Sequence, residues 1–251
     1  MNFDEIQPNR ELRAYARGQL NGVWGKMALT IFILWLIYLP ASFFSTLTSI
    51  NMYFNLIGPY LYLFGLDTPD FIPSFPVITN VLTIAVILSV GPFTLGFAGY
   101  FLKRVRGEEI ATKNIFDGFN RFFPSFLVWF FTGLFTFLWS LLLIIPGIIK
   151  MYGYSMAFYI MYDNPEIKPL EAIKKSQIMM KGYKGKLFLL QLSFIGWALL
   201  CSFFTFGIGS LWLIPYRGLS TANFYENLKR NQENSQETNQ MKTPIDLFQS
   251  T

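Results

Sequence analysis

The sequence contains several apolar runs that are long enough to cross a lipid bilayer, and no other feature constrains its fold as strongly. The first run starts at Met27 and continues for about 20 residues or more, the length that the hydrocarbon core requires. Signal-peptide cores are shorter and end at a small-residue cleavage site, so we expect this run to be retained as an anchor. Backbone polar groups in hydrocarbon must pair within their own segment, which favours helices.

The composition also indicates a membrane protein. Apolar residues make up 53% of the chain and charged residues only 14%, whereas soluble domains contain about 25% charged residues. A soluble domain of this length would leave much of that apolar surface in water. We therefore predict an all-α, polytopic membrane protein with about six transmembrane helices.

Six spans fit the apolar runs if two pairs of spans are joined by very short turns. The expected spans cover residues 26–49, 77–102, 125–143, 146–162, 187–205 and 210–227. The third and fourth belong to one run that is too long for a single crossing and is broken at Pro146. For residues 144–162, a re-entrant half-helix is the alternative to a full crossing.

The basic residues gather on one side of these spans. Of the 20 Lys and Arg residues, all except Lys150 and Arg217 fall on the side that holds both termini. Because Lys and Arg concentrate in cytoplasmic loops, we expect both termini in the cytoplasm. The chain then divides into a cytoplasmic N-terminal segment (1–25), a six-span membrane domain (26–228) and a disordered cytoplasmic tail (229–251) of polar composition.

Three stretches next to the spans are predicted to form amphipathic helices on the cytoplasmic surface. In residues 9–25, basic and apolar side chains both recur at helical spacing, although an ordinary solvated helix has the same pattern. The second stretch is residues 115–123, and the third lies within 163–186, with its helix starting near Pro169. The candidate residues for contact with anionic lipid are Arg10, Arg13, Arg17, Lys174, Lys175 and Lys181.

Each surface stretch leads into an odd-numbered span through a short link of Gly, aromatic and basic residues. The links are residues 22–26, 118–121 and 182–186, and the even-numbered spans each carry a proline, namely Pro92, Pro146 and Pro215. A threefold repeat of surface helix, link and helical hairpin is one hypothesis. The alternative is that such residues are common at any membrane interface.

Seven stretches carry a recognisable pattern: 13–24, 145–150 with Ile-Pro-Gly-Ile-Ile-Lys, 154–157, 163–165 with Asp-Asn-Pro, 171–176, 180–182 and 187–216. This pattern resembles an uncharacterised family of integral membrane proteins of Gram-positive bacteria, catalogued as domain of unknown function nine-seven-five. The resemblance covers most of residues 10–230. It implies a multi-pass protein of the bacterial cell membrane, without an agreed activity. Envelope maintenance, peptide export and immunity are the settings that this type of family suggests.

Residues for enzyme chemistry are scarce in this chain. There is no histidine, which removes the commonest acid–base catalyst and metal ligand. The single cysteine, Cys201, lies in an apolar run and cannot form an intrachain disulfide. Intramembrane aspartyl proteolysis needs two facing aspartates, but Asp163 lies only at the edge of a span. We therefore expect no enzyme, no cofactor and no metal site. The positive charges flank the spans instead of forming a basic domain for nucleic acid.

Arg217 is the most informative polar residue because it falls near mid-depth in the sixth span. An ionised side chain at that depth costs about 2.5–3.5 kcal/mol or more. No acidic residue lies at matching depth, so a backbone carbonyl, a lipid phosphate or an anionic ligand would be its partner. Snorkelling of the side chain is the simpler alternative. Asn80, Gln191 and Asn223 are expected to form hydrogen bonds between helices.

We expect a non-catalytic accessory or interaction protein. Its basic cytoplasmic face would bind membrane lipids, anionic ones above all, and a membrane or cytoplasmic protein partner. The alternative function is a small transporter or channel with a midplane site near Arg217. A cavity around Arg217 would favour the alternative, whereas a dry and tightly packed bundle would exclude it.

Overall fold

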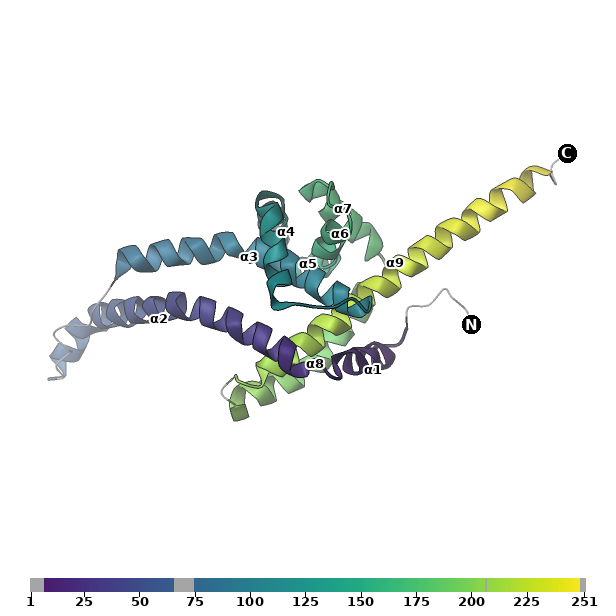
Figure 1. The fold of residues 1–251 in the computed structure, drawn as a ribbon. Coiled ribbons are helices and arrows are strands. Elements are labelled where there is room, and N and C mark those ends of the chain that lie inside the picture. Colours follow the sequence, from purple (N-terminus) through teal and green to yellow (C-terminus); the bar gives the residue numbers. More distant parts are fainter. Residues whose placement is uncertain (1–6, 66–74, 206, 249–251) are drawn as a thin grey trace. The chain divides into compact units, whose positions relative to one another are not determined.

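The computed structural model describes residues 7–65, 75–205 and 207–248, with side chains as far as Ser235. In order, the helices are α1 (Asn9–Leu20), α2 (Trp24–Leu63), α3 (Pro76–Val105), η1 (Thr112–Arg121), α4 (Phe122–Leu142), α5 (Ile144–Tyr154), α6 (Ala157–Asp163), α7 (Pro169–Met179), α8 (Lys184–Thr205) and α9 (Ser210–Phe248) (Figure 1). No strand occurs in these ranges, so the all-α prediction is confirmed. Parts of the expected terminal segments, 1–6 and 249–251, lie outside the described residues.

Five helical segments in the described ranges are long and apolar enough to cross a membrane. They are Trp24–Leu63, Pro76–Val105, Thr112–Leu142, Ile144–Asp163 and Lys184–Thr205. Each contains one of the first five spans expected from the sequence, except that the third expected span, 125–143, reaches one residue beyond Leu142. The expected sixth span lies in α9, which is not among the five.

The chain forms two compact units, one of residues 1–29 and 91–251 and one of residues 30–90. In the smaller unit, α2 and the first part of α3 run antiparallel. Hydroxyl–hydroxyl hydrogen bonds join Tyr38 to Ser89 at 3.2 Å and Thr48 to Thr79 at 2.8 Å. Asn80 was expected to form a hydrogen bond between helices, but the neighbouring residue Thr79 forms the bond from α3 to α2 instead.

In the larger unit, α4 and α5 form a hairpin with almost no loop. Leu143 alone connects them, in an extended conformation with φ −157° and ψ 139°. Pro146 is the third residue of α5, within the first turn, where a missing backbone N–H breaks no hydrogen bond of the helix. The two helices pack along each other. The long apolar run therefore folds back on itself, as its length and its proline predict.

The expected fourth span is interrupted between α5 and α6, at residues 155–156. The backbone N–H of Met156 donates to the Ser176 hydroxyl at 3.1 Å, and that hydroxyl donates to the Gly153 carbonyl at 2.8 Å. Ser176 belongs to α7 and is fully buried. The surface helix α7 therefore supplies the hydrogen bonds that a continuous helix would make internally.

The two other surface helices pack on hairpins from elsewhere in the chain. α1 lies against α9, where Asn223 donates to the Gln19 side-chain oxygen at 2.8 Å and Gln19 donates in return at 3.2 Å. This confirms Asn223 as an interhelical hydrogen-bond residue. η1, a 3₁₀ helix, lies against the second half of α3 through Gly96 and Gly118. A Cβ on either glycine would collide with the facing backbone carbonyl.

Two of the three expected repeat links share a backbone geometry. Gly22 and Gly182 both have positive φ, 78° and 85°, a conformation that favours glycine. In the first link, the Val23 N–H donates to the Leu20 carbonyl at 3.0 Å. In the same way, the Tyr183 N–H of the other link donates to the Met180 carbonyl at 3.2 Å. The third glycine, Gly118, lies inside η1 without positive φ. The threefold repeat therefore stays a prediction.

α9 continues far beyond the end of the expected sixth span. It is helical to Phe248, although we expected a disordered tail from residue 229. Residues 229–248 contain three Gln, two Lys and two Glu, which favour helices, and no glycine, but also three Asn, two Thr and Pro244, which do not favour helices. The polar composition that suggested disorder is equally compatible with a solvated helix.

The close approach of η1 to α3 predicts that added methyl groups destabilise the fold. We expect Gly96→Ala and Gly118→Ala each to lower the free energy of unfolding by about 1–3 kcal/mol, because the two backbones must separate. Gly133→Ala is the control, since a Cβ there meets no other atom within 4 Å. Thermal unfolding of the purified protein in mild detergent measures the effect. Equal melting temperatures for Gly96→Ala and Gly133→Ala would contradict the packing described.

Candidate functional site

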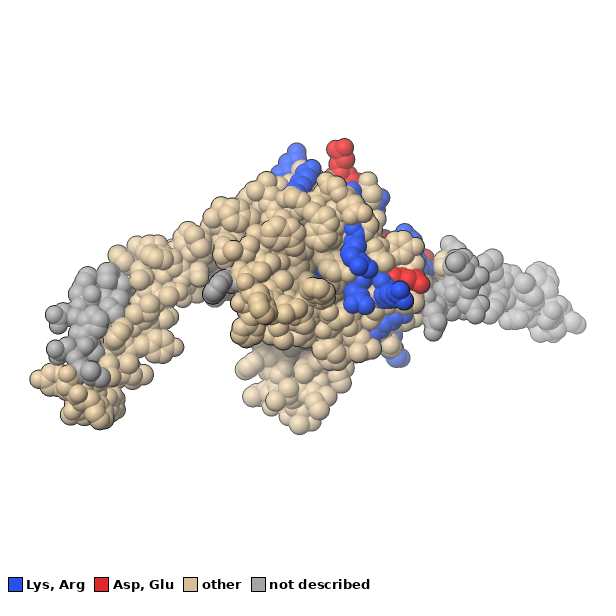
Figure 2. Space-filling view, turned by 90° about the horizontal axis from the view of Figure 1, so that it is seen from below, with Lys and Arg blue, Asp and Glu red and all other residues tan. Residues whose placement is uncertain are grey.

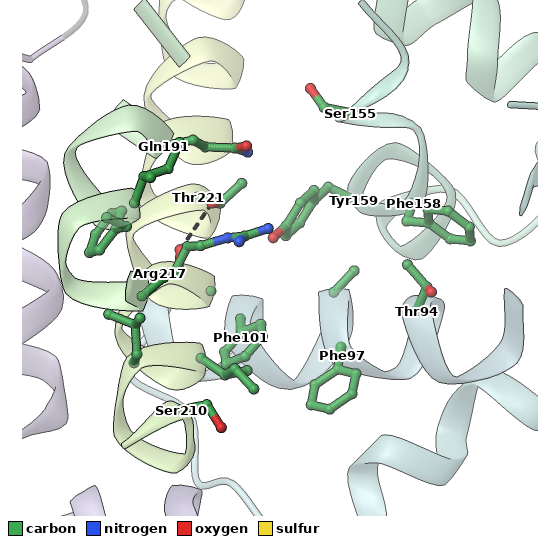
Figure 3. A pocket seen from close by; sticks show the side chains of 17 residues that line it. Thr94, Phe97, Phe101, Ser155, Phe158, Tyr159, Gln191, Ser210, Arg217 and Thr221 are labelled. Carbon is green, nitrogen blue, oxygen red and sulfur yellow. Dashed lines mark hydrogen bonds between the residues drawn. The ribbon is translucent and has the colours of Figure 1, made fainter. Parts of the chain in front are cut away.

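A cavity of about 530 Å³ lies among α3, α6, α8 and α9 in the larger unit. Most of its wall is apolar. Its polar side chains are Thr94, Ser155, Tyr159, Gln191, Ser210, Arg217 and Thr221 (Figure 3). Ser155 lies at the interruption between α5 and α6, so the break in the expected fourth span forms part of the wall.

Arg217 reaches from α9 into this cavity toward Tyr159 of α6 (Figure 3). Its side chain is exposed, and its guanidinium forms no ion pair or hydrogen bond with any residue whose position is described. At a rise of about 1.5 Å per residue, Arg217 lies about 10 Å along α9 from Ser210 and about 14 Å from Glu226. It therefore lies between the α8–α9 turn and the charged end of these helices.

Close packing between aromatic rings and a glycine determines the shape of the cavity. A Cβ on Gly218 would collide with the Phe101 ring, so the glycine lets α3 approach α9 beside Arg217. On the neighbouring wall, the Phe194 and Tyr216 rings meet edge to face, with centroids 5.0 Å apart. Gln191, another wall residue, accepts a hydrogen bond from the Tyr152 hydroxyl at 3.4 Å.

A second group of side chains, the Asp163 cluster, lies where α3, α6 and α9 meet. It consists of Arg106, Asp163, Tyr225, Glu226 and Lys229. Both Asp163 oxygens accept from Arg106, at 2.8 and 2.9 Å. Lys229 and the Tyr225 hydroxyl also donate to Asp163, at 2.8 and 3.0 Å, and Arg106 donates to Glu226 at 2.8 Å. One carboxylate thus receives four hydrogen bonds, two from Arg106 just after α3 and two from α9.

The two carboxylates of the Asp163 cluster are largely removed from water. Their side chains are 7% exposed in Asp163 and 12% exposed in Glu226. Burial by itself lowers the pKa of Arg106, but hydrogen bonds and attraction from Asp163 and Glu226 outweigh it and raise that pKa. Arg106 therefore stays charged, and the cluster joins the end of α6 to α9 and to the residue that follows α3. From the sequence we noticed only Asp163, as a residue at a span edge.

The six basic residues expected at the lipid surface lie away from the Arg217 cavity. Lys174, Lys175 and Lys181 are exposed on or just after α7, and Lys175 pairs with Glu171 at 3.5 Å. The other three, Arg10, Arg13 and Arg17, belong to α1. Figure 2 shows charged side chains gathered in one region of the visible face, whereas most of the remaining surface consists of other residue types.

The described residues contain no group of three or more His, Cys, Asp or Glu side chains that could hold a metal ion. A profile described as protein of unknown function (DUF975) matches residues 1–152 and 141–232. The chain belongs to the DUF975 family. The resemblance predicted from the sequence motifs is thereby confirmed. No curated protein and no solved structure matches this DUF975 protein.

The Asp163 cluster predicts a large loss of stability when its central charge is removed. We expect Asp163→Asn to lower the free energy of unfolding by about 3 kcal/mol, because Arg106 and Lys229 then lose their shared carboxylate. The control is Glu171→Gln, which breaks a half-exposed ion pair and should cost less than about 1 kcal/mol. Denaturant titration in detergent measures both. Similar midpoints for the two variants would contradict a stabilising role for the cluster.

Proposed function

We propose that this DUF975 protein is a non-catalytic membrane protein that binds a small organic anion with an apolar body in the Arg217 cavity. Of the two functions considered from the sequence, the small transporter or channel is the one that this geometry favours. The observation that carries the proposal is a guanidinium without an ionic partner among the described residues, exposed in a largely apolar cavity.

The energetics of Arg217 support an anionic ligand. An ionised arginine at membrane depth is unfavourable unless it meets a water-filled cavity or an anion. A bound carboxylate, sulfonate or phosphate would accept the guanidinium hydrogen bonds in a bidentate geometry. The phenylalanines and aliphatic residues of the wall would contact the apolar body of the ligand.

The interrupted helix supports the same proposal. Transporter sites are commonly formed where a membrane helix is broken and exposes backbone polar groups to a cavity. Here the break lies at residues 155–156, and Ser155, Phe158 and Tyr159 beside it line the cavity. Pro92 and Pro215 do not interrupt their helices, since α3 and α9 remain helical through both prolines.

The proposal includes a topology. We propose that α9 provides a sixth crossing and that both termini lie in the cytoplasm of a bacterial cell. The sorting of basic residues supports this orientation, since Lys150 and Arg217 are the two exceptions. An accessory role with a protein partner at the basic face stays a prediction, as do the settings of envelope maintenance, peptide export and immunity.

Fluorine NMR of the protein in nanodiscs tests the site, with para-fluorobenzenesulfonate as the anion and para-fluorobenzenesulfonamide as its neutral counterpart. We expect the protein to broaden the sulfonate signal and Arg217→Gln to weaken this binding about tenfold or more, because the charge pair is lost. Lys150→Gln is the matched control, since it removes the other span charge without altering the cavity wall. Equal binding of sulfonate and sulfonamide would contradict an anion site.

Release of the same sulfonate from loaded proteoliposomes separates transport from binding. The sulfonate is permanently charged and crosses a bare bilayer slowly. We expect release with the wild-type protein and with Lys150→Gln, and a large reduction with Arg217→Gln. Binding without release would leave an anion-binding protein and remove the transport part of the proposal.

A further inference from the structure

A second hollow, the α1 groove, lies between α1 and the α8–α9 hairpin, with a volume of about 620 Å³. Arg10, Arg13 and Arg17 form its basic side. Its apolar side consists of Trp24, Trp197, Cys201, Trp212, Leu213 and Tyr216. All of these residues belong to the larger unit. The surface arginines predicted from the sequence therefore face one hollow together with three tryptophans.

The arginines of the α1 groove have no acidic partner among the residues described. Arg13 donates only to the backbone carbonyl of Asn9, at 3.4 Å. Glu11 is the single acidic residue of α1, and it lines a different hollow. No acidic residue lines the groove itself. Three positive charges without an acidic partner in the described part of the chain attract an anion, and planar guanidinium groups match the oxygens of a phosphate.

The helix that carries these arginines is held firmly in place. Leu12, Ala16 and Leu20, on the side of the helix adjoining the arginines, are fully buried. The Asn9 side chain donates to the carbonyl of Lys186, near the start of α8, at 3.0 Å. At the opposite end, Gln19 pairs with Asn223 of α9. The arginines are thus positioned against the hairpin before a ligand arrives, which reduces the entropy cost of binding.

The apolar wall extends well away from the arginines. Asn9 places the start of α1 beside Lys186, whereas Trp197 lies about 16 Å further along α8 at about 1.5 Å per residue. Trp197 is 61% exposed and Trp212 is 48% exposed. A free phosphate bound to the arginines would leave the tryptophan side of the groove uncovered. A molecule with an anionic head and a long apolar chain would cover both sides of the groove.

We propose that the α1 groove is a binding site for an anionic membrane phospholipid. The headgroup phosphate lies on Arg10, Arg13 and Arg17, and one acyl chain follows Trp197 and Trp212. The site is separate from the Arg217 cavity, with which it shares only Leu213 as a wall residue. It does not depend on the proposed binding or transport of a small anion.

Native mass spectrometry of the full chain in detergent tests the site by titration with phosphatidylglycerol or phosphatidylcholine of the same chain length. We expect phosphatidylglycerol to bind about tenfold or more tightly than phosphatidylcholine. The choline cation neutralises the phosphate of phosphatidylcholine, whereas phosphatidylglycerol keeps a net negative charge that the arginines attract. The triple variant Arg10→Gln, Arg13→Gln, Arg17→Gln should lose this preference. The matched variant Lys174→Gln, Lys175→Gln, Lys181→Gln removes the same amount of positive charge and should keep the preference for phosphatidylglycerol. Equal losses in the two variants would overturn the proposal.

Photo-crosslinking of the wild-type protein provides a readout that needs no substitution. Phosphatidylglycerol with a diazirine on its acyl chain is activated in nanodiscs, and the labelled peptides are identified. We expect labelling to concentrate in residues 197–213 and to persist in excess glycerol 3-phosphate, which lacks the chain. Competition by glycerol 3-phosphate would indicate a soluble phosphate site, and even labelling of all apolar helices would indicate bulk lipid. Either result would overturn the proposal.

Arg217→Gln keeps the two proposals apart. This variant alters the cavity but no residue of the α1 groove, so we expect its preference for phosphatidylglycerol to equal that of the wild-type protein. A lost preference in Arg217→Gln, with the preference kept in the triple arginine variant, would assign the lipid to the Arg217 cavity and overturn the α1 groove as its site.

Discussion

The carboxylate of Asp163 is the point on which the association of the larger unit depends. In a bilayer, apolar helices gain little by leaving lipid for one another, because lipid chains are as apolar as leucine side chains. Specific association then relies on close packing and on polar contacts. Asp163 receives hydrogen bonds from Arg106, Tyr225 and Lys229, so three parts of the larger unit that are distant in sequence meet at one buried charge. Their charged ends are joined there in a defined register.

Close packing complements this polar contact. Gly96 and Gly118 bring the backbones of α3 and η1 together, and Gly218 admits the Phe101 ring between α3 and α9. These contacts hold α3 against η1 and against α9. The interruption between α5 and α6 lies on the wall of the space that they leave, and Arg217 projects into that space. The helices that are packed closely at these contacts therefore also form the wall of the Arg217 cavity.

The sequence predicted the helices better than it predicted their contacts. Apolar length located five of the spans, and Pro146 marked the reversal between α4 and α5. The interruption at residues 155–156 could not be predicted, because the hydrogen bonds that stabilise it come from Ser176, on a different helix. Arg217 was singled out from its depth alone. Arg10, Arg13 and Arg17 were predicted as a free lipid surface, since Trp197 and Trp212, which complete their groove, lie far away in the chain.

The packing of α1 on α9 has a consequence for the order of assembly. Gln19 leaves the ribosome early, but its partner Asn223 follows 204 residues later. At about 5–20 residues per second, α1 waits about 10–40 s before the surface that buries Leu12, Ala16 and Leu20 is synthesised. During that time its apolar face needs a temporary neighbour, which the bilayer surface can provide. Docking of the first helix therefore cannot precede synthesis of the last one.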